Sequence, residues 1–365
     1  MENHISGSET GCGTGAGASF VTSANLDAVS ELLARTSRVR NLDLKVEVPC
    51  PMKQRFLTEY TAFEKRYAEK VGRRPYAFVP TICPAHVEID NTLRDFAAMT
   101  SPDQVPDLIV GQVFGDMLFT GFFDRFVKTG TFKQVIDPAP LAPMRLDQFA
   151  DRYETFNPLA LFPEVLLVDR KVLGDKPVPR RMEDLLDPCY EGLLGLPDEH
   201  EYIGVRFLMH ILQNYGEDGL AAIERNAVTG FAGPAGARTA GTNAEPRAAI
   251  YLTPWIFAAG AHAPGRVDIV WPEDGLFVQP IALLVKKHLR PENEPILEWL
   301  LSEEVGRVFA DNHFISTNPA VDNRLPEDLS SFAWLGWDWI YDNDVATLRE
   351  TLRERFGRFH RPSMC

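Results

Sequence analysis

The chain has 365 residues, of which 45% are hydrophobic and 24% charged, which is enough apolar material to form a buried core in one large or two ordinary domains. Its 37 basic and 51 acidic residues give a net charge of −14 without any basic block, which disfavours binding to a nucleic-acid backbone. No apolar run approaches the roughly 18 residues that a membrane-spanning helix needs, so the sequence predicts no such helix.

The N-terminal stretch differs in composition from the rest of the chain. Residues 1–22 are rich in Gly, Ser and Thr, and we expect 1–41 to form a mobile tail with one short helix. The stretch has neither a basic n-region nor an apolar h-region, so we expect a cytoplasmic protein from the sequence as it stands. A mis-called start or a mature chain would look the same, and the protein would then be periplasmic. Five widely spaced cysteines suit reduced thiols.

From residue 42 onward, strand and helix patterns alternate. The sequence predicts strands at 42–48, 76–82 and 107–113, with a helix after each, beginning at Pro51, over 90–99 and over 115–127. The first helix has an apolar stripe made by Phe56, Tyr60, Phe63 and Tyr67. Alternation with short connections predicts a mostly parallel sheet covered by helices on both faces.

The pattern resumes after a Pro-rich stretch, residues 131–162, that we interpret as a long connection. Further strands are predicted at 164–169, 193–197, 248–252 and 267–271, with a helix over 204–215. The Gly-rich stretch 230–246 is predicted to be a loop, and it lacks the Lys-Ser/Thr ending of a phosphate-binding loop. The chain is therefore predicted to form two α/β lobes.

Residues 271–321 carry the clearest resemblance to a known family. They resemble the return crossover of ABC-transporter solute-binding proteins, in particular the ferric-iron and small-ligand branch, although Gly306 and Arg307 stand where Gln is usual. The segment 178–198, "VPRRMEDLLDPCYEGLLGLPD", is similar to a second motif of that family, and the two segments cover about a fifth of the chain. The matching positions in the first segment are Pro272, Gly275, Leu300, Leu301, Ser302, Glu304 and the "STNP" of 316–319.

The resemblance implies a two-lobed, periplasmic-binding-protein-like α/β fold. Extended crossovers near 164–169 and 276–286 would join the lobes, which would close over a ligand by a hinge motion. The implied organisation is a mobile N-terminal tail with a short helix at 1–41, a first lobe at 42–165 with 276–319, a second lobe at 166–275, and a C-terminal helical tail packed on a lobe at 320–365.

Two Cys-Pro steps lie at predicted strand ends, where α/β sheets bind ligands. Cys50 ends the first strand and precedes a helix start beside Lys53, a setting that favours the thiolate. Cys83 ends the second strand, and His86 follows closely enough to share a soft metal such as Zn, Ni, Co or Fe. Alternatively, both thiols are small buried hydrophobic groups.

Aromatic residues provide candidates in the second lobe. The resembled ferric-iron binders use two adjacent tyrosines, whereas here Tyr251 is followed by Leu252, which counts against ferric iron. Tyr251 and Trp255 could form an aromatic wall for an organic or cationic ligand, or belong to the core. Tyr202, in the connection 196–204, could reach the cleft.

The expected function is therefore that of an ABC-type solute-binding protein, or an intracellular relative, which captures a small ligand such as iron, another metal or a metal chelate and delivers it to an ABC permease. The alternative is a cytosolic enzyme on the same fold that uses cleft cysteines, although no catalytic motif occurs. A third interpretation, an interaction module, rests on three tryptophans within 334–339, which could equally pack the tail. The expected ligand-binding residues are Cys50, Lys53, Cys83, His86, Tyr202, Tyr251 and Trp255, with Cys50, Cys83, His86 and Tyr251 as candidate metal ligands.

Overall fold

The fold is described from a computed structural model. It describes residues 42–359 apart from 80–95, 97, 113, 115, 120, 138–145, 200–201, 232, 244–246, 262–264, 328 and 330. The predicted tail 1–41, Cys83, His86 and nearly all of the helix predicted over 90–99 lie outside these residues. The backbones of Cys50 and Tyr202 are described and their side chains are not.

Hydrogen-bonded strands form a mixed sheet with the main order β2-β1-β3-β11-β5-β9-β6-β7. Parallel pairing holds within β2-β1-β3 and within β8-β6-β9, as predicted. The expectation of a mostly parallel sheet is wrong for β5 and β10, which pair antiparallel, and for β11, which pairs antiparallel with β3, β4 and β5 and parallel only with the short β13. The strands are β1 Leu44–Glu47, β2 Ala77–Phe78, β3 Leu108–Gln112, β4 Phe132–Lys133, β5 Phe156–Asp169, β6 Leu194–Glu199, β7 Tyr202–Ile203, β8 Ala227–Phe231, β9 Ile250–Pro254, β10 Val267–Val270, β11 Leu276–Lys286, β12 Ile315–Ser316 and β13 Phe332–Ala333.

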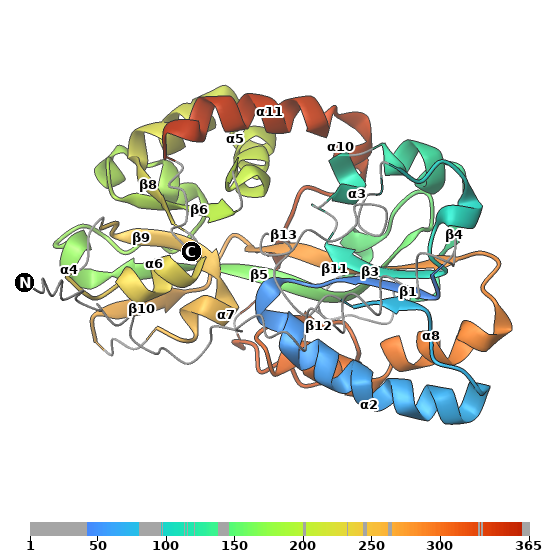
Figure 1. Cartoon of the computed structure of the whole chain (residues 1–365). Helices are drawn as coiled ribbons and strands as arrows, with labels where there is room; N and C mark the ends of the chain where they lie inside the picture. The colour runs from blue at the N-terminus through green and yellow to red at the C-terminus, as the bar shows by residue number, and fades with distance from the viewer. Residues whose placement is uncertain are drawn as a thin grey trace, which may run out of the picture.

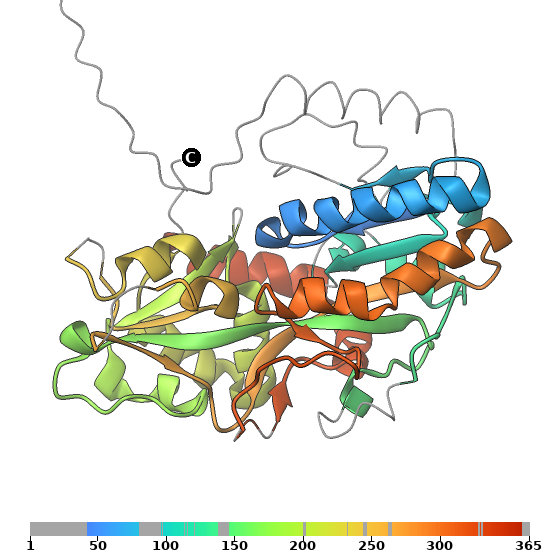
Figure 2. The ribbon, with the colours of Figure 1, turned by 90° about the horizontal axis from the view of Figure 1, so that it is seen from below.

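Helices cover both faces of the sheet. Figure 1 shows α5 and α11 on one side and α2 and α8 on the other, and Figure 2 shows α2 beside α8 and α9. The α-helices are α2 Lys53–Val71, α3 Asp116–Phe119, α4 Arg170–Leu173, α5 Val205–Asn226, α6 Gly233–Thr239, α7 Trp255–Ala258, α8 Glu294–Leu300, α9 Glu303–Ala310, α10 Trp337–Asp342 and α11 Val345–Phe356.

The stripe predicted for α2 is confirmed, because its four aromatic residues are buried against the sheet. The ring of Phe63 stacks on Trp299 of α8 with centroids 4.5 Å apart. The helix ends at Gly72, whose φ of 80° is a left-handed conformation that glycine adopts without a Cβ clash, and whose N–H donates to the carbonyl of Ala68. Apolar spacing and a glycine stop together define this element.

The longest strand, β5, exchanges its neighbours partway along its length. On one edge it pairs with β11 over 156–164 and then with β10 over 166–169. On the other edge it pairs with β12 at 160–161 and then with β9 over 164–168. β5 and the successive strands β10 and β11 are therefore the connections between the two groups of parallel strands (Figure 1).

Three sequence-based boundaries are wrong for identifiable reasons. β5 begins at Phe156, inside the predicted connection 131–162, because Pro158 lies beside a break in the pairing register, where a missing N–H is tolerated. The helix predicted over 115–127 ends as α3 at Phe119, and a π-helical turn follows after Gly121, whose φ is 69°. The predicted loop 230–246 contains α6.

The C-terminal tryptophans belong to the core. Trp337 is 2% exposed and stacks on Phe156 of β5 with centroids 3.9 Å apart, and its indole N–H donates to the carbonyl of Phe149 at 2.8 Å. Trp334 is half-buried and also stacks on Phe149. These contacts support the packing alternative for the cluster rather than a partner-facing patch.

Candidate ligand-binding site

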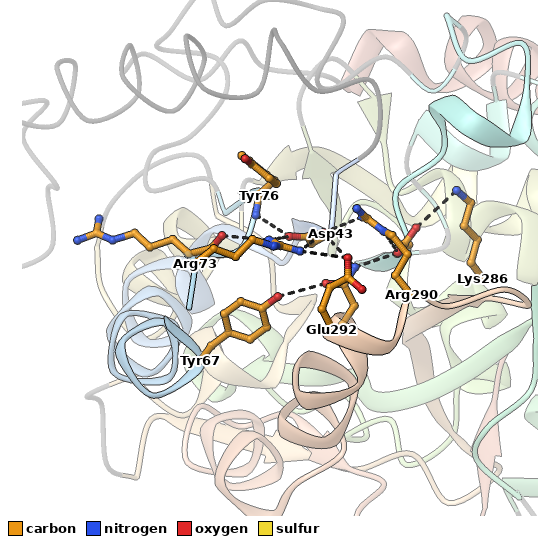
Figure 3. Close-up of polar contacts among 10 residues, drawn as sticks. Asp43, Tyr67, Arg73, Tyr76, Lys286, Arg290 and Glu292 are labelled. Atoms are coloured by element: carbon orange, nitrogen blue, oxygen red, sulfur yellow. Dashed lines mark hydrogen bonds and ion pairs between the residues drawn. The ribbon is translucent and has the colours of Figure 1, made fainter. Parts of the chain in front are cut away.

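A network of charged side chains lies at the amino-terminal ends of β1 and β3 (Figure 3). Asp43 precedes β1 and Asp107 precedes β3, and Arg290 donates to both carboxylates at 2.7 Å. Asn293 also donates to both, at 3.0 and 2.9 Å, and Arg73 donates to Asp43 at 2.6 Å. Ligands of α/β sheets bind at the opposite, carboxyl edge, so we assign this network to the stability of the fold.

The carboxyl ends of the two groups of parallel strands meet over β5. The end of β3, Gln112, pairs with Ile281 of β11, which in turn pairs with Ala160 of β5. The end of β9, Pro254, pairs with Glu164 of β5. Because β3 and β9 run in opposite directions, their carboxyl ends face each other across residues 160–164, the place where a ligand is expected.

A buried ion pair lies at this place. Arg206, near the start of α5, donates to Glu164 at 2.9 Å, and the two side chains are only 10% and 3% exposed. The guanidinium also lies 6.0 Å from the centre of the Phe162 ring, which stacks on Phe314. A buried pair needs good geometry to offset its lost hydration, so these contacts fix the start of α5 on the crossover.

Gln279 lies beside the ion pair on the same face of the sheet. It is opposite Phe162 in the register, and facing residues of an antiparallel pair project to the same side. Its side chain is buried, at 2% exposure for the residue, and neither amide atom has a hydrogen-bond partner in the described part of the chain. Burying an unsatisfied polar group costs about 1–3 kcal/mol, so a hydrogen-bonding molecule held here would be favoured.

An aromatic group lies on the other face of the crossover. Trp255 follows β9 as the first residue of α7, and its ring contacts Trp271 and His313 edge-on at 4.9 and 4.8 Å. All three side chains are half-buried. Burial, and then the charge of Arg324, lower the pKa of His313, so the ring is neutral at pH 7. The group therefore presents uncharged aromatic surface next to the carboxyl end of β9.

The other expected site residues are found in different settings. Lys53 is the buried first residue of α2. Cys50 lies in the 3-10 turn that leads into α2, as expected for a position before the helix, but β1 ends at Glu47, so Cys50 does not end the strand. Tyr202 lies in β7, directly before α5. Tyr251 is 1% exposed, its hydroxyl accepts from the N–H of Ala248, and its ring packs edge-on against Phe231, which favours the core alternative for this residue.

The metal site predicted from Cys50, Cys83, His86 and Tyr251 depends on side chains that are mostly outside the described residues. Within the described ranges, no three His, Cys, Asp or Glu side chains are grouped so that they could hold a metal ion. No described helix is both long enough and apolar enough to cross a lipid bilayer.

Sequence reasoning missed Glu164, Arg206 and Gln279. A signal was present, because Gln279 interrupts the apolar strand "LFVQPIALLV" and Glu164 precedes the apolar "VLLV". A polar residue inside an apolar strand is an informative exception to ordinary burial. The partner of Glu164 comes from a helix 42 residues away, and that pairing depends on the tertiary fold.

The chain has a mixed α/β, periplasmic-binding-protein-like fold, in which crossover strands join two groups of parallel strands. The chain belongs to the family of bacterial extracellular solute-binding proteins, whose family model matches residues 103–343, about two thirds of the sequence. The family predicted from the motifs at 178–198 and 271–321 is thus confirmed. No curated protein sequence matches the chain.

Solved structures of similar fold support this class. A ferric binding protein of Bordetella is 18% identical, with a TM-score of 0.53, over 87% of this chain and 98% of that one. Iron-bound HitA from Pseudomonas aeruginosa is 15% identical, with a TM-score of 0.57, over 87% and 99%. AfuA from Actinobacillus pleuropneumoniae, with bound fructose-6-phosphate, is 13% identical, with a TM-score of 0.54, over 87% and 98%. At these identities the similarity establishes the fold alone.

Proposed function

We propose that the chain is the solute-binding component of an ABC importer, which captures one small solute over the crossover and presents it to a membrane permease. The observation that carries this proposal is the pairing register, since it brings the carboxyl ends of β3 and β9 to face each other over residues 160–164 of β5. The family is described as extracellular, so we propose that the protein works outside the cytoplasm.

The two groups of parallel strands would be the cores of two lobes. In this proposal the first lobe comprises 42–165 with 276–319 and the second comprises 166–275. Each crossover changes from one lobe to the other near Glu164, where β5 exchanges both of its neighbours. A small rotation about these two strands would move the facing strand ends together over a solute, as in hinge closure.

The side chains of Glu164, Arg206 and Gln279 form what we call the crossover floor, and their chemistry favours a small polar solute. Gln279 offers an amide donor and acceptor, and Arg206 and Glu164 provide charge of both signs beside it. The half-buried Trp255 and Trp271 lie on the other face of the crossover and do not line this floor. The predicted residues Cys50, Lys53 and Tyr202, with Cys83 and His86, remain proposed members of the rim.

We propose an organic solute or a metal chelate rather than a bare ferric ion. HitA holds iron and AfuA holds fructose-6-phosphate, so this fold accommodates both kinds of ligand. Here, however, the phenol of Tyr251 is buried and accepts a backbone hydrogen bond, and Leu252 replaces a second phenol. Fe(III) prefers several hard anionic oxygens, which a single buried phenol does not supply. A chelate brings most of its own ligands.

Gln279→Leu tests the site directly. The variant removes an unsatisfied buried amide, so we expect the free energy of unfolding to stay the same or rise by about 1 kcal/mol. Affinity for the solute that native mass spectrometry finds on the purified protein should fall about tenfold, as for the loss of one buried hydrogen-bonding group. Val278→Ala is the control, since it alters the opposite face of the same strand and should lower stability without affecting affinity. Unchanged affinity in Gln279→Leu would place the solute elsewhere.

The enzyme alternative has no observation in its favour among the described residues. The family is one of binding proteins, and a binding role needs no reacting group in the site. A single assay separates the two functions, because a binding protein returns the solute unchanged after denaturation. Recovery of a chemically altered solute from a catalytic amount of protein would overturn the binding proposal.

A further inference from the structure

A second pocket lies away from the crossover floor and has a volume of about 450 Å³. Five parts of the chain that are distant in sequence form its walls. They are the 3-10 helix Leu146–Phe149, the turn at the start of the 3-10 helix Glu183–Leu186, the middle of α5, the turn before β11, and the C-terminal segment around β13.

This pocket is separate from the proposed solute site. Along α5, His210 and Tyr215 come four and nine residues after Arg206, which places them about 6 and 13 Å further along the axis at roughly 1.5 Å per residue. The ring of Phe277 lies between the two places, since it faces Glu164 in the register and its centroid is 5.2 Å from that of His210.

Acidic groups dominate the charge of the pocket. The carboxylate of Asp274 is held in place by the backbone N–H groups of Met182 and Glu183, at 2.8 and 3.2 Å. Glu183 provides a second carboxylate, and the positive charge in the lining comes from Arg181, which pairs with Glu183. Burial raises the pKa of Tyr215, and the negative charges of Asp274 and Glu183 raise it further. Two carboxylates and one guanidinium, itself paired, therefore line the pocket.

The remaining walls are aromatic or neutral. His210 is 7% exposed, and burial lowers its pKa to about 4, so at pH 7 it is an uncharged ring. Its Nδ1 lies 3.1 Å from the amide nitrogen of Asn214. Phe332, Trp334 and Tyr215 add aromatic surface. Aromatic faces attract cations through their quadrupole, most strongly where water is partly excluded.

We propose that this pocket binds a small organic cation, an alkylammonium group held between the aromatic walls and the carboxylates of Asp274 and Glu183. The volume is within the range of small-molecule sites. The described residues contain no group of three side chains arranged for a bare metal ion, which favours an organic cation over an inorganic one. An anion would meet two carboxylates and one arginine that is already paired.

Isothermal titration calorimetry with choline tests the proposal, with the uncharged tert-butyl analogue of choline as the matched probe. We expect saturable binding of choline at constant ionic strength and at least about tenfold weaker binding of the analogue, because the charge provides the attraction. Equal binding of both probes, or no saturable binding of choline, would overturn the proposal.

Two charge-matched variants locate the binding. Glu183→Gln should weaken choline about threefold to fivefold, the effect of one partly exposed charge. Glu298→Gln removes the same charge from α8, outside the pocket, and should leave the affinity unchanged. Equal effects in both variants would mean non-specific attraction to an acidic protein. Titrating the native solute in the same preparations keeps the two sites distinct, since neither variant alters the residues of the crossover floor.

Discussion

Glu164 and Arg206 bring opposite charges to the point where β5 exchanges its neighbours, and little of either side chain reaches water. Removing two charges from water is expensive, so such a pair often adds little net stability over apolar residues of the same volume. Removing one partner is different, because the remaining charge is then buried without compensation. The pair is therefore expected to fix geometry more than to stabilise the fold.

Arg206→Met should lower the free energy of unfolding by about 3 kcal/mol or more, since it removes the guanidinium that offsets the charge of the buried Glu164 carboxylate. The double variant Glu164→Leu with Arg206→Met should recover most of that loss, because both charges are then removed together. Urea denaturation of the two single variants and the double variant completes the cycle. If the losses of the single variants simply add, the two side chains are not coupled in the folded state.

The network at the amino edge predicts a dependence on pH. Burial alone raises the pKa of the Asp107 carboxyl. The hydrogen bonds from Arg290 and Asn293 and the positive charges of Arg290 and Lys286 outweigh burial, so the pKa lies below its ordinary value. A lowered carboxyl pKa in the folded state stabilises the protein above the ordinary carboxyl pKa, and this contribution is lost as the pH falls through the lowered value.

Asp107→Asn should therefore be less stable than the native chain by about 2 kcal/mol at neutral pH, and the difference should shrink below about pH 4. Chemical denaturation of both proteins across this range measures the difference directly. A difference that is constant with pH would show that the charge of Asp107 does not contribute.

At the scale of elements, the sequence predicts best where one periodic signal dominates. The apolar stripe of α2 carries such a signal. The bounds of β11, 276–286, agree with the crossover that the family resemblance implied. The predicted end of the helix over 204–215 coincides with Gly216, whose φ of 64° breaks the helical geometry, yet α5 continues beyond it to Asn226. The glycine in the sequence indicates the kink, but the continuation of α5 to Asn226 is visible only in the folded structure.

A capping residue divides the apolar stripe at 296–309 into two helices. Ile296, Leu300, Val305 and Phe309 have the spacing of one helix in the sequence and are all buried, but they lie on α8 and α9. Ser302, two residues after the end of α8, caps α9 by accepting from the N–H of Val305. The candidate site was predicted less well than the fold, because the contacts of Arg206 and Gln279 join segments that are far apart in the sequence.

Helix α11 links parts of the molecule on either side of the crossover (Figure 1). Arg355 pairs with Glu217 and Glu224 of α5, at 2.7 and 3.0 Å. Toward the other end of the helix, the guanidinium of Arg349 lies 4.2 Å from the centre of the Phe119 ring of α3. A hinge motion that moves α3 relative to α5 must therefore loosen one of these contacts.

Arg355→Ala should increase the hydrogen exchange of backbone amides near the C-terminal end of α11, with a loss of global stability of only about 0.5–1 kcal/mol, since the ion pairs are partly exposed. Arg353→Ala is the matched control, because the ion pair of Arg353 with Glu350 stays within α11. The effect of Arg355→Ala should also fall at high salt. Equal hydrogen exchange in the two variants would show that the ion pairs of Arg355 with α5 do not hold the end of α11.

At the scale of the whole molecule, the proposed function requires two lobes that close over a solute. One apolar cluster contains residues of α3, α5, β5 and α11, including Met117, Phe207, Leu166 and Phe356, so packing is continuous on the face of the sheet that α5 and α11 cover. We therefore expect the motion to be a bend where β5 exchanges its neighbours, and we do not expect free rotation of independent domains.

The most direct test is the distance between the lobes, measured by single-molecule energy transfer between dyes attached through unnatural amino acids at Lys65 of α2 and Arg238 of α6, two exposed positions. Adding the solute identified on the native protein should shift the population toward shorter distances with a single binding constant, and Gln279→Leu should shift the midpoint to higher solute concentration. A distance distribution that is unchanged at saturating solute would contradict capture by hinge closure over the crossover.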